Sequence, residues 1–345
     1  MDEKVRAAVA GVEAYVVGGA VRDELLGRPV VDVDVACADP ETAARIHQRL
    51  SAGALFPLSE RHGAWRVALA GGRTVDFTPL RGTIEDDLAG RDFTINAVAV
   101  PVAGGEAVDP FAGRGDLEAG IIRAVRPSVF DDDPLRLLRA VRLEDELGFG
   151  LDAGTERLLR ERAGRAAEPA GERVLGELER FSPDGFRRAG ELGLLAPLGG
   201  SLDRLDEVDL VDTPGYLLVV VLGESLFRLP ISNELRRMAK VLLAAERPAD
   251  ASPRSIHRFR VRTEPWAVTA LAYLGAPELY DAVRAARAAD PSEPLLRGDE
   301  LGVPPGPEVG RLLERIAEER AAGTISTREE ALALVERERA VTPPT

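Results

Sequence analysis

The sequence predicts an α+β N-terminal region followed by α-helical domains. Three observations support this prediction. Within the first 125 residues, strand-like runs with period-two alternation are interleaved with short helical stretches. From "DDDPLRLLRAVRLEDELGF" onward the chain is rich in Ala, Leu, Glu and Arg, with Pro and Gly as breaks, which is typical of helices. The length of 345 residues exceeds that of one ordinary compact domain.

The expected elements follow from these runs. Residues 40–50 predict a helix, with Asp39 as N-cap and Pro40 in its first turn. Residues 304–323 predict another, because apolar residues recur there at helical spacing, whereas residues 247–259 are expected to form a loop or linker. A short helix is also expected near residues 21–26. The expected strands are 14–19, 30–37, 65–72, 73–80 and 97–103.

The composition narrows the possible classes of protein. The net charge is -14, yet almost all cations are arginines, which suit bidentate contacts with phosphates and base edges. Three histidines and the single Cys37 predict no zinc site and no HD-type metal-dependent phosphohydrolase domain. The single cysteine and the absence of a signal pattern fit the cytoplasm, and the longest apolar run is too short to span a membrane.

Two aspartates alternate with valines in "VVDVDV". On a strand, Asp32 and Asp34 face the same side, where their carboxylates repel each other unless a cation lies between them. Hard oxygen ligands on a rigid strand favour Mg²⁺. An acidic face on a half-exposed edge strand is the alternative interpretation.

A third carboxylate, Asp76, lies in the strand-like run "RTVDFTPL". If the two strands are neighbours, three carboxylates could hold two metal ions that activate a hydroxyl and bind a triphosphate. A surface position for Asp76 is the alternative. Upstream, the Gly18-Gly19 turn allows a phosphate to approach the backbone, and Arg22 adds a cation.

These motifs resemble those of the tRNA nucleotidyltransferase and bacterial poly(A) polymerase family, class II, within the polymerase-β-like nucleotidyltransferases. "VGGAVRDELLGRPVVDVDV" resembles the first motif of the family and "RDFTINAVAV" the second. "DPFAGRGDLEAGIIR", "DDDPLRLLRAVRL" and "ERVLGELERF" resemble the third, fourth and fifth, in family order. The resemblance implies a catalytic head over residues 1–125, a neck that recognises the base over 126–190, a body over 191–285 and a tRNA-binding tail over 286–345.

The resemblance also implies roles for individual residues. Asp133 and Arg136 match the pair that hydrogen-bonds the edge of the incoming base, so that protein replaces a template. A carboxylate accepts from the amino group of C or A, and a guanidinium donates to ring or carbonyl acceptors. Further residues expected at the nucleotide are Arg91, Asp92, Asn96, Arg139 and Arg142.

The spacing of the fourth motif has a physical interpretation of its own. Asp133, Arg136, Arg139 and Arg142 lie three residues apart, so their side chains are expected to fan over one half of a helix. The other half carries apolar residues that can pack on a core: Leu137, Leu138 and Val141. A merely solvated charged face is the alternative.

The sequence departs from the family pattern in three places. Gly90 stands where the family usually has a second arginine, and Asp132 replaces a glutamate before Asp133. The segment 77–90 is short, whereas many relatives carry a longer flexible loop there. In the fifth motif, we expect helix-packing ion pairs rather than catalytic groups from Glu172, Arg173 and Glu177.

The sequence therefore predicts a Mg²⁺-dependent enzyme that adds C, C and A from CTP and ATP to the 3' hydroxyl of tRNA and releases pyrophosphate. Addition of CC alone, of A alone, or of a poly(A) tract are alternatives within the class. Two further classes are a nucleotidyltransferase of small molecules and a non-catalytic RNA-binding relative. Arg311, Arg315 and Arg320 in the tail favour a large substrate, and the intact Asp32 and Asp34 favour catalysis.

Overall fold

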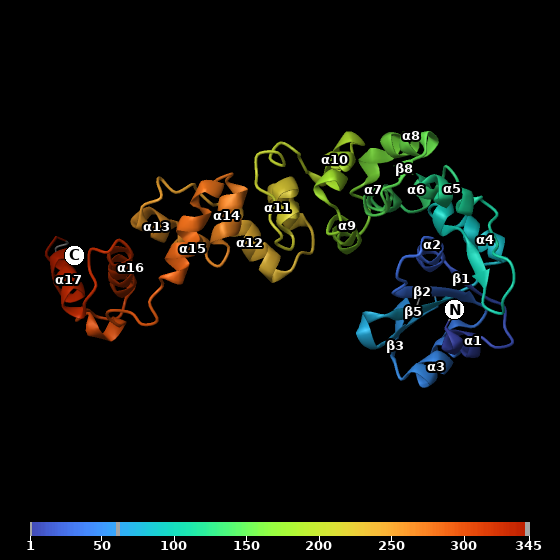
Figure 1. Ribbon diagram of the computed structural model, residues 1–345, viewed down its shortest axis with the longest axis horizontal. Coiled ribbons are helices and arrows are strands. Elements are labelled where there is room, and N and C mark those ends of the chain that lie inside the picture. Colours follow the sequence, from blue (N-terminus) through green and yellow to red (C-terminus); the bar gives the residue numbers. More distant parts are fainter. Residues whose placement is uncertain (1, 60–62, 342–345) are drawn as a thin grey trace. The chain divides into compact units, whose positions relative to one another are not determined.

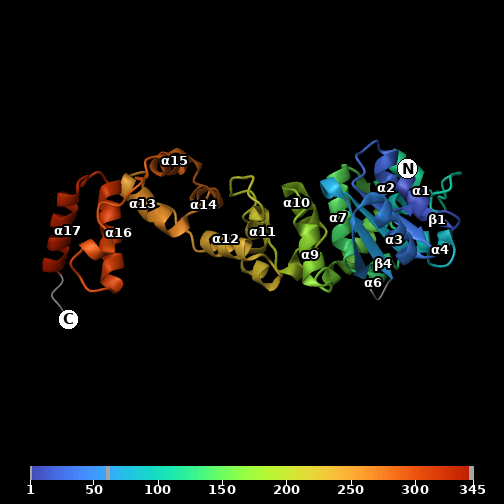
Figure 2. The same cartoon turned by 90° about the horizontal axis from the view of Figure 1, so that it is seen from below.

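The computed structural model describes residues 2–59 and 63–341 and divides into two compact units at Gly199–Gly200 (Figures 1 and 2). The first unit contains the predicted head and neck, and the second contains the predicted body and tail. The finer division into four domains stays a prediction. His62 lies outside the described residues.

A six-stranded mixed sheet forms the base of the first unit. Its strand order is β3-β4-β5-β2-β1-β6, and β2 and β5 are the parallel pair. The five predicted strands are all present, but β3 was not predicted because Pro57 interrupts a run that is largely exposed. The strands are β1 (Ala14–Val17), β2 (Asp32–Cys37), β3 (Ala54–Ser59), β4 (Ala64–Ala68), β5 (Thr74–Pro79) and β6 (Ala99–Pro101).

Period-two alternation gives the sheet two different faces. Val16 and Val35 pack in a core with α1 (Glu3–Ala8) and α3 (Pro40–Ser51), which lie on the same side of the sheet in Figure 1. α3 begins as predicted, with the Asp39 carboxylate accepting from the Thr42 amide at 3.1 Å. The opposite face carries Val17 and Ala36, which pack with α4 (Ile84–Ala89). Asp32 and Asp34 share the register of Ala36 and therefore belong to this second face.

In the chain order of the first unit, some helices lie between the strands of the sheet and the others come after them. α2 (Gly19–Leu25) lies between β1 and β2, and α7 buries Leu137, Leu138 and Val141, as the sequence predicts. Asp133 is not on α7: it ends α6 in an extended conformation, so the prediction of one helix from Asp133 to Arg142 is wrong by about one turn. The remaining elements are α5 (Gly113–Ala119), β7 (Ile121–Ile122), α6 (Val129–Asp132), α7 (Arg136–Leu147), β8 (Gly150–Leu151), α8 (Ala153–Arg162), α9 (Gly171–Leu178) and α10 (Pro183–Glu191).

The described part of the second unit is helical and contains two separate apolar clusters. One lies on α13 to α15, and the other contains Leu312 and Ile316 of α16, the predicted tail helix. The expected linker 247–259 is half helix, because Ser252 and Pro253 are a helix N-cap and first-turn pair. The helices are α11 (Tyr216–Leu222), α12 (Asn233–Leu243), α13 (Pro253–Thr263), α14 (Ala267–Tyr273), α15 (Tyr280–Ala288), α16 (Pro307–Ala321) and α17 (Arg328–Val341).

Short 3₁₀ turns complete both units: η1 (Ala70–Gly72), η2 (Thr94–Asn96), η3 (Ala163–Arg165), η4 (Ala196–Leu198), η5 (Gly223–Arg228), η6 (Pro277–Leu279) and η7 (Gly298–Glu300). Among the described residues, no single helix is long and apolar enough to cross a membrane. One bent pair, Tyr216–Arg228 with Asn233–Leu243, meets the length and composition requirements together.

Gly113 provides a test of the close packing between α5 and Thr94 of η2. A Cβ atom there would lie 2.1 Å from the Thr94 carbonyl oxygen, whereas a Cβ at Gly115 in the same helix would meet nothing within 4 Å. We expect Gly113→Ala to lower the free energy of unfolding by about 1–3 kcal/mol, because backbone must move. Gly115→Ala should raise it by up to about 1 kcal/mol. Urea unfolding of the two variants tests this, and equal midpoints would contradict the close approach.

Candidate active site

Most of the predicted site residues line one pocket of about 310 Å³ in the first unit. Strand β2, the β1–α2 turn, the segment before η2, the α6–α7 connection and α9 all contribute to it. Nine predicted residues lie in its wall: Gly18, Gly19, Asp34, Arg91, Asp92, Asn96, Asp133, Arg136 and Arg139. Three further lining residues were not predicted there: Gly90, Leu135 and Arg173.

The carboxylates of the sheet lie next to one another. Asp34 and Asp76 are direct partners in the parallel β2–β5 register, which confirms the predicted pairing of these two strands. Burial raises the pKa of Asp34, and the carboxylates of Asp76 and Asp32 raise it further, whereas Arg91 and Arg139 lower it. A further cation near Asp34 would therefore favour its ionised form.

Asp76 already has a partner in the neighbouring strand. Arg66 of β4 donates from Nε and Nη2 to its two carboxylate oxygens, at 2.7 Å each, and the Asp76 residue is only 8% exposed. Asp32 is exposed and accepts from the Thr74 hydroxyl at 2.6 Å. Asp34 is therefore the carboxylate of the three that faces the pocket.

The turn after β1 needs a glycine at Gly18. Its φ is +74°, and a Cβ atom would lie 2.9 Å from Nη1 of Arg91 and 3.1 Å from Oδ2 of Asp34. Backbone, a carboxylate and a guanidinium therefore meet at one point of the pocket wall. Arg91 is held there by Asp87, which accepts from its Nη2 at 3.0 Å.

Asp92 connects the sheet side of the pocket to α7. Its carboxylate accepts from Nε of Arg139 at 2.5 Å, from the Asn96 side chain at 3.0 Å and from the Phe93 amide at 2.8 Å. Burial raises the pKa of Asp92, but Arg139 and the two other donors outweigh that effect and lower it below the usual range. Arg22 donates to Asn96 Oδ1 at 2.8 Å, so it holds a lining residue without lining the pocket itself.

The predicted base-recognition pair lies at the other side of the pocket. Arg136 donates to the carbonyl oxygens of Gly90 at 2.7 Å and Val129 at 3.2 Å. Asp133 accepts from both terminal nitrogens of Arg173, at 2.6 and 3.2 Å. Arg173 thus makes an ion pair, as expected, but the pair is part of the pocket wall.

Arg142 is, with Arg22, one of the two predicted nucleotide contacts that the structure places outside the pocket lining. It is 3% exposed and donates to Glu177 of α9 at 2.5 Å and to Glu146 at 2.6 Å. These contacts indicate a packing role for Arg142, and for Glu177 the ion pair expected from the sequence. Asp32, Asp76 and Arg22 also lie outside the lining residues.

The residues at the pocket fit a metal ion that is shared with a substrate. Among residues 2–59 and 63–341 there is no group of three or more His, Cys, Asp or Glu side chains arranged to hold a metal by themselves. Mg²⁺, however, is commonly held by one or two carboxylates together with substrate phosphates and water. Asp34, with its raised pKa, and Asp32 on the same strand face match that donor set.

Comparisons with known proteins now identify the family. A model of the poly A polymerase head domain matches residues 14–123. The A-adding tRNA nucleotidyltransferase of Deinococcus radiodurans is 33% identical over 96% of this chain and 96% of its own length. The chain belongs to the tRNA nucleotidyltransferase and poly(A) polymerase family. This confirms the resemblance inferred from the sequence, and the mixed sheet followed by helices confirms the fold class.

Two other relatives in this family carry different product names. The CC-adding tRNA nucleotidyltransferase of Thermus thermophilus is 33% identical over 94% of this chain and 93% of its own length. The CCA-adding enzyme of Bacillus stearothermophilus, solved in complex with CTP, is 27% identical, with a TM-score of 0.74 and 98% of both chains covered. Family membership therefore leaves open which nucleotides this chain adds.

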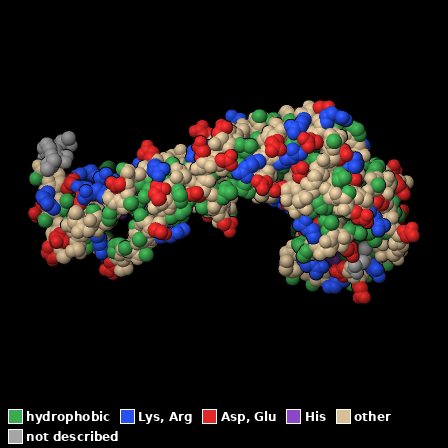
Figure 3. Space-filling view, turned by 45° about the horizontal axis from the view of Figure 1, so that its top comes forward, with side chains coloured by type: hydrophobic (Ala, Val, Ile, Leu, Met, Phe, Trp, Pro, Cys, Tyr) green, Lys and Arg blue, Asp and Glu red, His purple; other side chains and the backbone are tan. Residues whose placement is uncertain are grey.

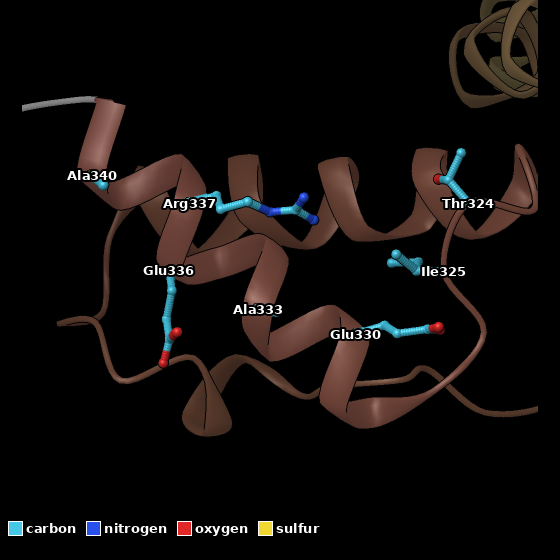
Figure 4. Close-up of a pocket in the computed structure, with 7 residues that line it drawn as sticks. All are labelled: Thr324, Ile325, Glu330, Ala333, Glu336, Arg337 and Ala340. Atoms are coloured by element: carbon cyan, nitrogen blue, oxygen red, sulfur yellow. The ribbon is translucent and has the colours of Figure 1, made fainter.

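Another hollow, of about 520 Å³, lies on α17 in the second unit (Figure 4). Figure 4 shows two alanines, Ala333 and Ala340, with Arg337 and two glutamates. None of the predicted site residues lies there. Its open, mostly solvent-facing lining offers no arrangement of groups comparable to the pocket at Asp34.

The buried Arg142–Glu177 pair gives a stability prediction. Removing Glu177 leaves a guanidinium that is 3% exposed without its closest carboxylate, so Glu177→Ala should cost about 3–5 kcal/mol of unfolding free energy. Glu161→Ala, which breaks the exposed pair with Arg157, should cost less than about 1 kcal/mol. Denaturant unfolding of both variants measures the difference, and similar values would show that the Arg142–Glu177 pair does not stabilise the packing of α7 on α9.

Proposed function

We propose that this chain is a tRNA 3'-end nucleotidyltransferase that transfers CMP, CMP and then AMP from CTP and ATP, with release of pyrophosphate. One observation carries the proposal: a single pocket joins the Gly18–Gly19 turn and Asp34 to the pair Asp133 and Arg136. The names of the relatives support tRNA as the acceptor, and the CTP complex of one of them supports a nucleoside triphosphate as the donor.

Asp32 and Asp34 would hold Mg²⁺, which stabilises negative charge on the reacting phosphate when it is bound. Asp76 would act differently in this proposal. Its two oxygens are engaged by Arg66, so it contributes by keeping Arg66 and the strand register in place. A role of Asp76 as a direct metal ligand would require that ion pair to open.

The triphosphate would lie at the glycine turn. Gly18 lets backbone approach closely, and Arg91 points a guanidinium at the same place. Arg139 supplies a second cation, whereas Asp92, Asn96 and Arg22 fix its position and that of the turn. Arg142 is not part of this proposal for the nucleotide, because its guanidinium is buried and engaged by the carboxylates of Glu177 and Glu146.

The base would lie between Asp133 and Arg136. Cytosine and adenine both present an amino group that can donate a hydrogen bond to a carboxylate, whereas uracil and guanine present a carbonyl oxygen at the equivalent position. Arg136 donates to two carbonyl oxygens of the protein, which fix its guanidinium and use two of its five N–H groups, so others are left for acceptors on a base.

Binding of tRNA by the tail, residues 286–345, remains a prediction. Arg311 and Arg315 both pair with Glu338 of α17, and Arg320 donates to the Glu293 carbonyl oxygen. These arginines are therefore engaged within the tail itself, and their number alone does not indicate an RNA surface.

A product that ends after two cytidines is the second candidate, and the short segment 77–90 favours it. Thr83 and Asp86 form a capping box that starts α4, so few residues remain irregular. The end of α4 is also tied to the neck, because Arg126 donates to the Ala89 carbonyl at 3.0 Å and Arg136 donates to Gly90. A fixed segment resists the shift that a change from cytosine to adenine would require.

Replacing Asp34 tests the proposed chemistry. Asp34→Ala and Asp32→Ala should each reduce CMP incorporation into a tRNA that ends before CCA by several orders of magnitude, because charge stabilisation by the metal is lost. Thermal unfolding should change little, since neither residue belongs to the apolar core. Asp184→Ala, at a side chain that is 86% exposed, is the control. Near-normal turnover in either site variant would refute the assignment.

The addition of A tests the second candidate. With CTP and ATP supplied together, we expect the AMP step to be slower than the CMP steps, so that the product with two added nucleotides accumulates transiently. Arg126→Ala removes one of the ties on α4 and should speed the AMP step relative to the CMP steps. Arg157→Ala, at an exposed ion pair, should not. Products are resolved at single-nucleotide length.

Each product pattern has a distinct meaning. Permanent arrest at two nucleotides would identify a CC-adding enzyme, and prompt completion to three would show that the short segment does not limit the switch. A long A tract from ATP alone would identify a poly(A) polymerase and contradict the main proposal.

A further inference from the structure

We propose that Arg173 is a positioning residue for base selection: it orients the Asp133 carboxylate so that one oxygen is left to accept an amino hydrogen of the incoming base. This inference rests on the proposed function. It concerns a residue of the fifth motif, for which the sequence indicated only an ion pair between helices.

The backbone alone does not fix the Asp133 side chain. Asp133 precedes a proline and is extended, with φ -150° and ψ 100°, between the end of α6 and the start of α7. Helical packing therefore does not restrict its rotamer. Its carboxylate is held by side-chain and backbone donors instead.

Arg173 holds that carboxylate from the facing helix. Nη1 donates to Oδ1 at 3.2 Å, and Nη2 donates to Oδ2 at 2.6 Å, so both oxygens meet the planar end of one guanidinium. Such bidentate contacts define the plane of the carboxylate as well as its position. Both residues line the pocket.

The hydrogen bonds leave one acceptor site facing a ligand. A carboxylate offers about four lone-pair sites. Oδ1 accepts from Arg173 and from the Leu135 amide, the latter at 3.2 Å, whereas Oδ2 accepts from Arg173 alone. Oδ2 therefore has one site available for an N–H donor. An ionised carboxylate carries no hydrogen, so Asp133 cannot donate to a carbonyl oxygen. Cytosine and adenine place an amino N–H donor at one position of the base edge, whereas uracil and guanine place a carbonyl oxygen there, which a carboxylate repels.

The backbone of Arg173 is itself anchored. Glu177, one turn further along α9, forms the buried ion pair with Arg142 of α7 and also approaches Arg139 to 3.7 Å. Arg173 and Glu177 thus lie on the face of α9 that contacts Asp133 and α7. The Arg142–Glu177 ion pair fixes the position of α9 against α7. Arg173, on the same helix, therefore holds the Asp133 carboxylate in a fixed orientation.

The test compares discrimination between CTP and UTP. We expect Arg173→Ala to lower the ratio of kcat/KM for CTP over UTP by about 10- to 100-fold, mainly by raising KM for CTP, because Asp133 loses its orientation. Arg173→Lys keeps the charge without the planar fork and should restore the ratio only in part. In an Asp133→Ala background, Arg173→Ala should have no further effect on the ratio.

Arg180→Ala is the matched control. Arg180 is 56% exposed, compared with 52% for Arg173, and it pairs with Glu146 at 2.7 Å just beyond the end of the same helix, away from the pocket lining. Its loss should leave the CTP/UTP ratio unchanged. Thermal unfolding midpoints of the two variants should agree, so that a difference in the ratio reflects the pocket and not folding.

The outcomes are distinct. If the wild-type chain and Arg180→Ala incorporate no CMP, the proposed function fails and this inference fails with it. If they are active and Arg173→Ala keeps the CTP/UTP ratio within twofold, only the positioning role is overturned. A lower KM for CTP in Arg173→Ala would show that Arg173 competes with the base for Asp133. Full restoration by lysine would overturn the argument from orientation.

Discussion

The contact between Asp92 and Arg139 is the interaction on which the pocket depends. Asp92 belongs to the segment that follows α4 beside the sheet, and Arg139 belongs to α7. Their hydrogen bond, with Asn96 and the Phe93 amide on the same carboxylate, fixes the sheet side against the helix side. Because Asp34 lies on the former side and Arg136 on the latter, this contact holds together the two sides of the proposed nucleotide site.

Ion pairs take the place of a positively charged surface in this acidic protein. On the face shown in Figure 3, Lys and Arg side chains lie among Asp and Glu side chains. The pocket follows the same pattern: Arg91 pairs with Asp87, Arg139 with Asp92 and Arg173 with Asp133. Each cation is therefore held in place before a nucleotide arrives, which reduces the conformational entropy lost on binding. The net charge of -14 consequently says little about the local field at the site.

The sequence predicted the sheet side of the site better than the helix side. Period-two alternation is a local signal, so it gave the shared face of Asp32 and Asp34. The β2–β5 pairing that brings Asp76 beside them was only a hypothesis, which alternation alone does not give. Arg142 was expected at the nucleotide because of the family resemblance, and the three-residue spacing, which spreads these side chains over half of the helix, did not contradict that. From Arg136 to Arg142 the helix turns by about 120° away, which carries the last arginine into the core. Its partner Glu177 is 35 residues distant, beyond any local pattern.

The same limit explains why the sequence could not define the role of Asp76. Its neighbour across the antiparallel β4–β5 register is Arg66, in a strand whose pairing no local motif specifies. Because Arg66 engages both of its oxygens, Asp76 has fewer acceptor sites left for another ligand, although its charge still raises the pKa of Asp34. Two free carboxylates bind one hard cation firmly enough to hold it, yet leave its remaining positions for phosphate oxygens and water. The contact with Arg66 therefore supports Asp32 and Asp34, and not Asp76, as the ligands of the proposed metal site.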